Sequence, residues 1–202
     1  MTGLRPAPAG RRHPRPAAGT PPRCALDLCS RSGPAEFADP ATRRLVEHTG
    51  STTELLEQWT GQPLTVRVLR QSRHPAPAFC RSVADLLRLD RDAQLVVRRS
   101  ELAAPNGAPV SRNTVVAGLP ADPRLAAALA DLAQPLGRTL APHAADFARE
   151  LVASGRSPWH RETGGRRADR GRAVWRGYLL RSRGVPVAYV EERFDPSLVD
   201  AS

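Results

Sequence analysis

Residues 94–119, QLVVRRSELAAPNGAPVSRNTVVAGL, contain two strand-like runs on either side of a strong turn signal. Both runs, 94–104 and 109–119, are rich in apolar and β-branched residues, as is typical of strands. Pro105-Asn106-Gly107-Ala108 stands between them. Asn-Gly is the pair that tight hairpin turns favour, because both central positions need a positive φ. The stretch therefore predicts an antiparallel hairpin.

A second hairpin is predicted at the end of the chain, where RAVWRGYLL (172–180) and PVAYVEERF (186–194) flank a Ser-Arg-Gly turn. LTVRVLRQ (64–71) adds a strand by its alternation. Helices are expected between these strands, at 34–50, at 51–60, at 82–89 and from Asp122 to Ala133. The second of them opens with a capping box formed by Ser51 and Glu54. Segment 143–154 fits a strand or a helix, and 155–170 is expected to be a loop rich in glycine and arginine.

Strands that come in hairpins, with helices inserted between them, predict the fold class. We expect an α+β domain, an antiparallel β-sheet with helices packed on one face. The length of 202 residues suits one domain of ordinary size plus a tail. Residues 1–23 are rich in proline, alanine and arginine and cannot build a core, so they are expected to be a disordered tail. Residues 24–202 form the expected domain.

The formal net charge of +10 raises the question of nucleic-acid binding. All 30 basic residues are arginine, and five of them lie in the tail without any acid. The rest of the chain carries 25 basic and 20 acidic residues, with few aromatic residues to stack on bases. The expectation is no nucleic-acid partner and only a modest positive field that attracts small anions.

No run of about 18 to 20 apolar residues is present, so no membrane partner is expected, and the N-terminus has no secretory signal. We expect a soluble, cytoplasmic protein. Its three cysteines, Cys24, Cys29 and Cys80, are too few and too irregularly spaced for a disulfide framework. Its five histidines are scattered. No metal site and no cofactor are expected.

The last strand contains the least usual placement in the chain. Glu192 shares one face with Ala188, Val190 and Phe194, because side chains alternate along a strand. Burying an unpaired carboxylate costs several kcal/mol, so Glu192 is either a partnered, functional group with a raised pKa or a strand-end residue that points to water. Glu191 falls on the other face.

The strand at 94–104 raises a similar question. Arg99 shares a face with Leu95, Val97 and Glu101, and Arg98 shares the other face with Val96 and Leu102. An inward arginine is suited to binding a carboxylate through two parallel hydrogen bonds. A salt bridge to Glu101 or to a neighbouring strand is the alternative.

From Gly50 to Pro196 the chain resembles the chorismate lyase family. The similar segments, in order, are GSTTELLEQ, VVRRSEL, RNTVV, QPLGRTL and GYLLRSRGVPVAYVEERFDP. The Pro-Leu-Gly element within QPLGRTL is the most specific of them. The resemblance implies a cofactor-free chorismate pyruvate-lyase that converts chorismate to pyruvate and a hydroxybenzoate, most simply 4-hydroxybenzoate, for an aromatic product of secondary metabolism.

The resemblance also implies the site residues. Arg99 would bind a substrate carboxylate, with Arg98 as the alternative if the register differs by one. Glu192 would act at the hydroxyl or ether end of the substrate. The backbone of Leu136 would contact the hydroxyl end. At the position where the family can hold a methionine over the substrate ring, this chain has Thr52. The pocket is therefore expected to differ in shape from the family's.

A second class of function fits the same fold. Ligand-binding domains of this kind occur in bacterial transcription regulators, usually beside a winged-helix DNA-binding domain. The sequence before residue 24 predicts only a tail, which counts against this alternative. The sequence does not fix the product isomer, the pathway or the oligomeric state. An arginine-rich nucleic-acid binder is the third alternative and rests on net charge alone.

Overall fold

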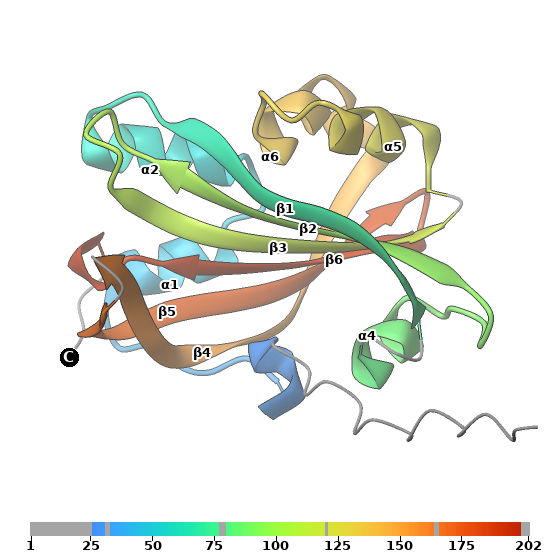
Figure 1. The fold of residues 1–202 in the computed structure, drawn as a ribbon, viewed down its shortest axis with the longest axis horizontal. Coiled ribbons are helices and arrows are strands. Elements are labelled where there is room, and N and C mark those ends of the chain that lie inside the picture. Colours follow the sequence, from blue (N-terminus) through green and yellow to red (C-terminus); the bar gives the residue numbers. More distant parts are fainter. Residues whose placement is uncertain (1–25, 31–32, 77–79, 120, 164–165, 199–202) are drawn as a thin grey trace, which may run out of the picture.

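The computed structural model describes residues 26–30, 33–76, 80–119, 121–163 and 166–198 (Figure 1). The predicted tail, 1–23, lies outside these residues. The helices are α1 (Pro40–Glu47), α2 (Thr52–Thr60), α4 (Arg81–Leu86), α5 (Pro123–Ala130) and α6 (Leu136–Leu140), with 3-10 turns η1 (Asp27–Ser30), η2 (Ala141–Asp146) and η3 (Pro196–Leu198). The strands are β1 (Thr65–Pro75), β2 (Gln94–Ala103), β3 (Pro109–Leu119), β4 (Phe147–Thr163), β5 (Arg166–Ser182) and β6 (Val185–Phe194).

The six strands form one antiparallel sheet in the order β1-β2-β3-β6-β5-β4. Both predicted hairpins are present. In the β2–β3 turn, Gly107 has a φ of +78°, and the Ala108 N–H donates to the Asn106 side chain at 2.9 Å. In the β5–β6 turn, Arg183 and Gly184 both have positive φ, as a tight hairpin requires. The expected α+β class with an antiparallel sheet is confirmed.

Local signals set the helix ends. The Ser51 side chain accepts the N–H of Glu54 at the start of α2, and Gly61 ends α2 in a left-handed conformation. Asp122 caps α5 in the same way. The helix expected over 34–50 is shorter, because it starts only after Asp39, whose side chain caps α1 just ahead of Pro40.

One expectation was wrong. The segment 155–170, predicted to be a loop, consists largely of the ends of β4 and β5, which pair from Gly155↔Trp175 to Thr163↔Arg166. Glycine and arginine are poor strand signals locally, but the pairing partner lies in the same long hairpin and supplies the hydrogen bonds. The ambiguous segment 143–154 divides between η2 and the start of β4.

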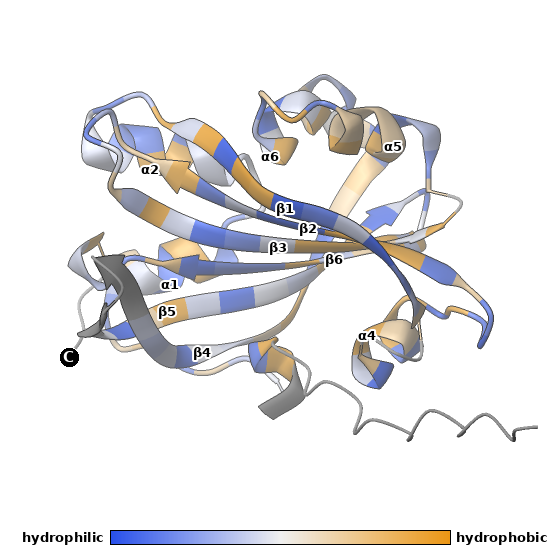
Figure 2. Cartoon of the chain, viewed as in Figure 1, coloured by the Kyte–Doolittle hydropathy of each residue, from blue (hydrophilic) through white to orange (hydrophobic). Residues whose placement is uncertain are grey.

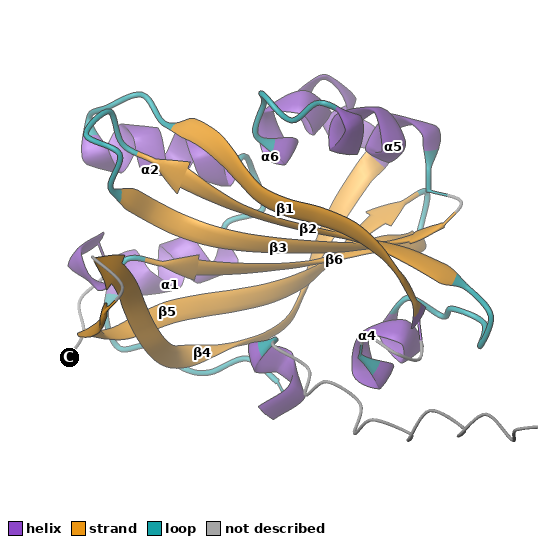
Figure 3. Cartoon of the chain, in the orientation of Figure 1, coloured by secondary structure: helices purple, strands orange, loops and turns teal. Residues whose placement is uncertain are grey.

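The helices divide between the two faces of the sheet (Figure 3). On one face, α1, α2, α5 and α6 pack on two apolar clusters that include Leu45, Leu56, Leu125 and Phe194. This is the expected helical layer. On the other face, α4 and the residues beside η1 cover a third cluster at one end of the sheet. As a result, β2 is buried on both faces over Leu95–Arg98.

The strands β1 and β4 form the two edges of the sheet. Most of β1 is hydrophilic (Figure 2) and carries Arg67, Arg70 and Arg73. The register of β1 with β2 shifts between Val68 and Arg70, which marks a bulge at Leu69. None of the helices in the described part of the chain is long and apolar enough to cross a membrane.

Candidate ligand-binding site

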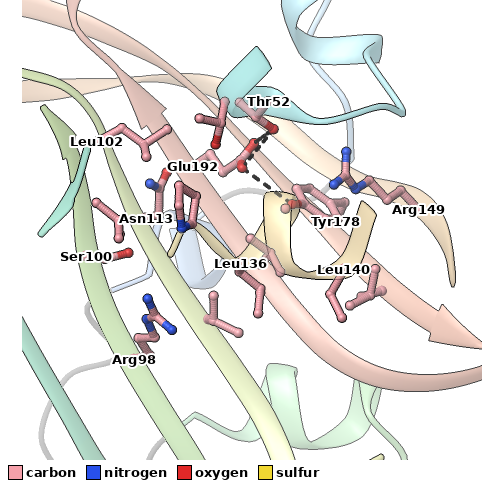
Figure 4. Close-up of a pocket in the computed structure, with 17 residues that line it drawn as sticks. Thr52, Arg98, Ser100, Leu102, Asn113, Leu136, Leu140, Arg149, Tyr178 and Glu192 are labelled. Carbon is pink, nitrogen blue, oxygen red and sulfur yellow. Dashed lines mark hydrogen bonds between the residues drawn. The ribbon is translucent and has the colours of Figure 1, made fainter. Parts of the chain in front are cut away.

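A pocket lies between the sheet and the helical layer (Figure 4). Its walls come from β1, β2, β3, β4, β5 and β6, from the start of α2 and from the segment around α6. The polar residues in its lining are Thr52, Thr53, Arg98, Ser100, Asn113, Arg149, Tyr178 and Glu192. The enclosed volume is about 50 Å³, well below the roughly 300–1,000 Å³ of sites for drug-sized ligands. The pocket is therefore small.

Glu192 lies at one end of this pocket and is partnered rather than isolated. Its carboxylate accepts from the Arg176 Nε–H at 2.8 Å, from the Thr52 hydroxyl at 3.0 Å and from the Tyr178 hydroxyl at 3.4 Å. The side chains of Arg176 and Glu192 are 1% and 9% exposed. Burial, reinforced by the negative charge of Glu192, raises the pKa of Tyr178 to about 12. Tyr178 therefore stays a neutral donor at physiological pH.

Arg176 connects this end of the pocket to α1. Its Nη1 group donates to the carbonyl oxygens of Leu45, Val46 and His48 at the end of that helix, at 2.7, 3.2 and 2.7 Å. A positive charge is stabilised near the C-terminal end of a helix, where the helix dipole is negative. Burial and the Arg176 charge lower the pKa of His48. The remaining Arg176 group, Nη2, donates to the Thr52 hydroxyl at 2.8 Å, so Arg176 holds Glu192 and its hydrogen-bond partner together.

Arg98, and not Arg99, lines the pocket, at the end away from Glu192 (Figure 4). Arg98 is 1% exposed, and burial lowers its pKa, with Asp131 acting in the opposite direction. Three of its N–H groups donate to the carbonyl oxygens of Ala128, Asp131 and Gln134, which belong to the segment over the pocket. A guanidinium has five N–H donors, so two of those of Arg98 have no partner among the described residues.

The expected orientation of Arg99 into the pocket is corrected. Arg99 is exposed on the opposite face of the sheet, beside Thr114, its register partner on β3. Arg98, the alternative residue, lines the pocket instead, because the alternation along β2 directs its side chain to the helical face.

The structure brings the other three predicted residues together. Thr52, Leu136 and Glu192 all line the pocket, and Thr52 donates to Glu192. Their roles toward a ligand stay predictions.

The sequence did not predict three residues of this region: Arg149 and Tyr178, which line the pocket, and Arg176, which contacts Glu192. Arg149 donates to the Thr49 carbonyl at 3.0 Å and lies over the Tyr178 ring, with the guanidinium carbon 5.4 Å from the ring centre. Its segment fitted a strand or a helix, so no face could be assigned. Arg176 carried a signal that was available, because it alternates with Val174 and Tyr178 on an apolar face of the predicted hairpin.

Within the described ranges, no group of three or more histidine, cysteine or acidic side chains could hold a metal ion. The polar lining of the pocket includes the ion-paired Glu192 carboxylate with the Thr52 hydroxyl and the Tyr178 phenol at one end, and the guanidinium groups of Arg98 and Arg149. This lining favours an anionic ligand with an apolar body and a polar far end.

No protein-family profile matches the sequence, and no curated protein is significantly similar to it. Solved structures do share its fold. The match to PhnF from Mycobacterium smegmatis has a TM-score of 0.53 and 14% identity, covering 75% of this chain and 66% of PhnF. The match to the effector domain of PhnF has a TM-score of 0.51 and 14% identity, covering 73% of this chain and 90% of that domain.

A weaker match, with a TM-score of 0.45 and 8% identity, is to a transcriptional regulator of the GntR family from Bacillus cereus and covers 66% of this chain and 92% of that one. At these identities the likeness shows the fold alone. The chain therefore has the α+β fold of the PhnF effector domain.

Proposed function

We propose that this chain is a small-molecule-binding domain whose pocket holds a carboxylate-bearing molecule of about one ring without transforming it. The observation that carries the proposal is how the hydrogen-bonding groups of Glu192 and Arg98, at the two polar ends of the pocket, are occupied. Glu192 is engaged by Arg176, Thr52 and Tyr178, while Arg98 keeps two N–H donors for a ligand. All three of these partners are donors to the Glu192 carboxylate, so the contacts hold this group as a hydrogen-bond acceptor.

Two further features bear on the ligand and on its fate. The volume of about 50 Å³ is smaller than a substituted ring, so the ligand is at most about one ring and the pocket must widen to take it. A solved structure with this fold is named as an effector domain. In the proposed complex the ligand carboxylate lies on the free edge of Arg98, and Arg149 adds positive charge at the pocket. A hydroxyl at the far end of the ring donates to Glu192.

A chorismate pyruvate-lyase is the second candidate. It is favoured by the presence in one pocket of Glu192, Thr52, Leu136 and a strand β2 arginine, which is the set that the resemblance implies. In that reaction Arg98 takes the carboxylate role first assigned to Arg99. Release of pyruvate aromatises the ring, so orientation of the substrate supplies much of the catalysis.

One pair of measurements separates the candidates. Calorimetric titration with 4-hydroxybenzoate tests binding, with the uncharged 4-hydroxybenzamide as the matched ligand. Incubation with chorismate, followed by assay of pyruvate, tests lysis. We expect saturable binding of the carboxylate, about tenfold or more weaker binding of the amide because a charge-assisted pair is lost, and no pyruvate above the buffer rate.

Variants complete the test. Arg98→Met should weaken binding of 4-hydroxybenzoate by about tenfold or more, and Arg44→Gln, which removes an exposed arginine on α1, should leave it unchanged. Pyruvate release that disappears in Glu192→Gln would replace the binding proposal with the lyase. Absence of both binding and lysis would overturn both candidates.

A further inference from the structure

A second cavity opens on the face of the sheet opposite the pocket. Its volume is about 180 Å³, larger than that of the pocket itself. Its side chains are those of Leu69, Arg99, Arg112, Thr114, Glu191 and Arg193, from β1, β2, β3 and β6. Register pairs Arg99 with Thr114 and Thr114 with Glu191, so these three side chains form a row across the floor of the cavity.

The carboxylates near this cavity are already engaged by other groups. Glu191 accepts from the Arg193 Nη2–H at 3.0 Å, from the Asp27 backbone N–H at 2.9 Å and from the Tyr189 hydroxyl at 3.3 Å. Glu101, in the next row of the sheet, accepts from the guanidinium groups of Arg67 and Arg112. Both carboxylates are buried, at 2% and 4% exposed.

Arg99 contributes a positive charge to this cavity that no described carboxylate pairs with. Among the residues that the structure describes, the Arg99 guanidinium has no hydrogen bond or ion pair. Two further arginines, Arg112 and Arg193, line the same cavity. Arg70, its exposed register partner on β1, adds a further positive charge to this face. Glu191 and Asp27 both pair with Arg193 and repel an anion at that end of the cavity. The cavity therefore has excess positive charge at Arg99.

We propose that this cavity is a second ligand site, which binds a small oxyanion group, carboxylate or phosphate, through the guanidinium of Arg99. The Thr114 hydroxyl, next to Arg99 across the strand pair, supplies a second donor. Leu69, 55% exposed at the bulge of β1, gives the rim an apolar surface for the rest of the ligand.

The second site is separate from the pocket but shares a wall with it. Arg98 and Arg99 are neighbours in sequence and line different cavities, and Ser100 and Asn113 line both. The two ligands would be separated by the thickness of one sheet. A site built on Arg99 also accounts for the second arginine of VVRRSEL, which the pocket leaves unused.

The test follows backbone amide chemical shifts by NMR while inorganic phosphate or acetate is titrated into the full chain at constant ionic strength, held with sodium chloride. We expect saturable shifts in the millimolar range at Arg99, Thr114 and Arg193. Comparison of the two probes shows which oxyanion the site prefers. Shifts at Arg98 and Glu192, which line the pocket and not this cavity, show separately whether the probe also binds in the pocket.

Two variants and a control make the result decisive. Arg99→Gln should weaken binding at this cavity by about tenfold or more, and Thr114→Val should weaken it less, because a neutral donor contributes less than a charged one. Arg44→Gln removes the same charge from a helix on the other face and should change nothing. Shifts that do not saturate, or that are equal in Arg99→Gln and the unmodified chain, would overturn the proposal, whatever happens at the pocket.

Discussion

The two adjacent glutamates of β6 build similar clusters on opposite faces of the sheet. Glu192 pairs with Arg176 and lies near Tyr178, and Glu191 pairs with Arg193 and lies near Tyr189. Both carboxylates are buried, at 7% and 2% exposed. A carboxylate, a guanidinium and a phenol are thus present twice, back to back.

The surroundings of the two clusters differ. Both glutamates line a cavity, but the partners of Glu192 come from β5 and from the start of α2. Glu191 accepts backbone N–H groups from Asp27 and Leu28 of η1, so its cluster attaches the N-terminal part of the domain to the sheet. Burial raises the pKa of Glu191, and Arg193 acts against this; burial and the Glu191 charge raise the pKa of Tyr189. The two clusters thus have similar groups but different neighbours: α2 leaves a pocket beside Glu192, whereas η1 donates its backbone N–H groups to Glu191.

Removing Arg176 should have the largest effect. Arg176→Met leaves a buried carboxylate without its counter-ion and three carbonyl oxygens at the C-terminal end of α1 without their donor, so the free energy of unfolding should fall by about 3–5 kcal/mol. Urea denaturation measures this loss. The exposed pair Arg138–Glu57 is the matched control, and Arg138→Gln should cost less than about 1 kcal/mol.

The double variant Arg176→Met/Glu192→Leu sharpens this result. An apolar pair of similar volume removes the unpaired charge, so it should recover much of the lost stability. A double variant as unstable as Arg176→Met alone would assign the loss to the carbonyl oxygens of α1 instead.

A smaller effect is expected on the Glu191 side. A Cβ on Gly177 would lie 2.1 Å from the Tyr189 hydroxyl oxygen, which itself donates to Glu191. Gly177→Ala should therefore displace Tyr189 and lower the free energy of unfolding by about 1–3 kcal/mol. Adding Tyr189→Phe removes the clashing oxygen and should restore part of the loss in the same denaturation measurement. No recovery at all would contradict this assignment.

The smallest effect is a pH dependence. Because the pKa of Glu191 is raised in the folded chain, the folded state holds this proton more firmly than the unfolded state. The corresponding stability is present below the ordinary pKa of 4.5 and is lost as pH rises through the folded value. Arg193, Asp27 and Tyr189 face the carboxyl group and set the size of the loss.

Glu191→Gln cannot titrate and serves as the reference. The free energy of unfolding of the unmodified chain, measured against that of Glu191→Gln, should fall as pH rises above 4.5. A difference that rises with pH would mean that Arg193 outweighs burial.

The two hairpins, and which side chains face one another across them, can be predicted from the sequence. Asn106-Gly107 and Arg183-Gly184 fix the two turns, and the second turn brings Arg176 opposite Glu192 in the register. The alternation that singled out Glu192 could therefore have found its partner on the neighbouring strand. Thr52 and Leu136 were placed by resemblance rather than by pattern.

The choice between Arg98 and Arg99 could not be made from alternation, for a physical reason. Alternation reports which face is buried only when one face is exposed. The α4 and η1 region covers the second face of β2 at one end, so Leu95 through Arg98 are all buried. The strand at 155–163 was missed because its stability comes from pairing with β5 rather than from local preference.

The edge strand β1 has a consequence for solubility at high concentration. An exposed edge presents unpaired N–H and C=O groups on which a strand of another molecule can add. Along β1, Arg67, Arg70 and Arg73 place like charges where two such edges would meet, and the bulge at Leu69 interrupts the straight ladder that addition needs. The same arginines that charge this side of the sheet thus protect the domain against aggregation through its β1 edge.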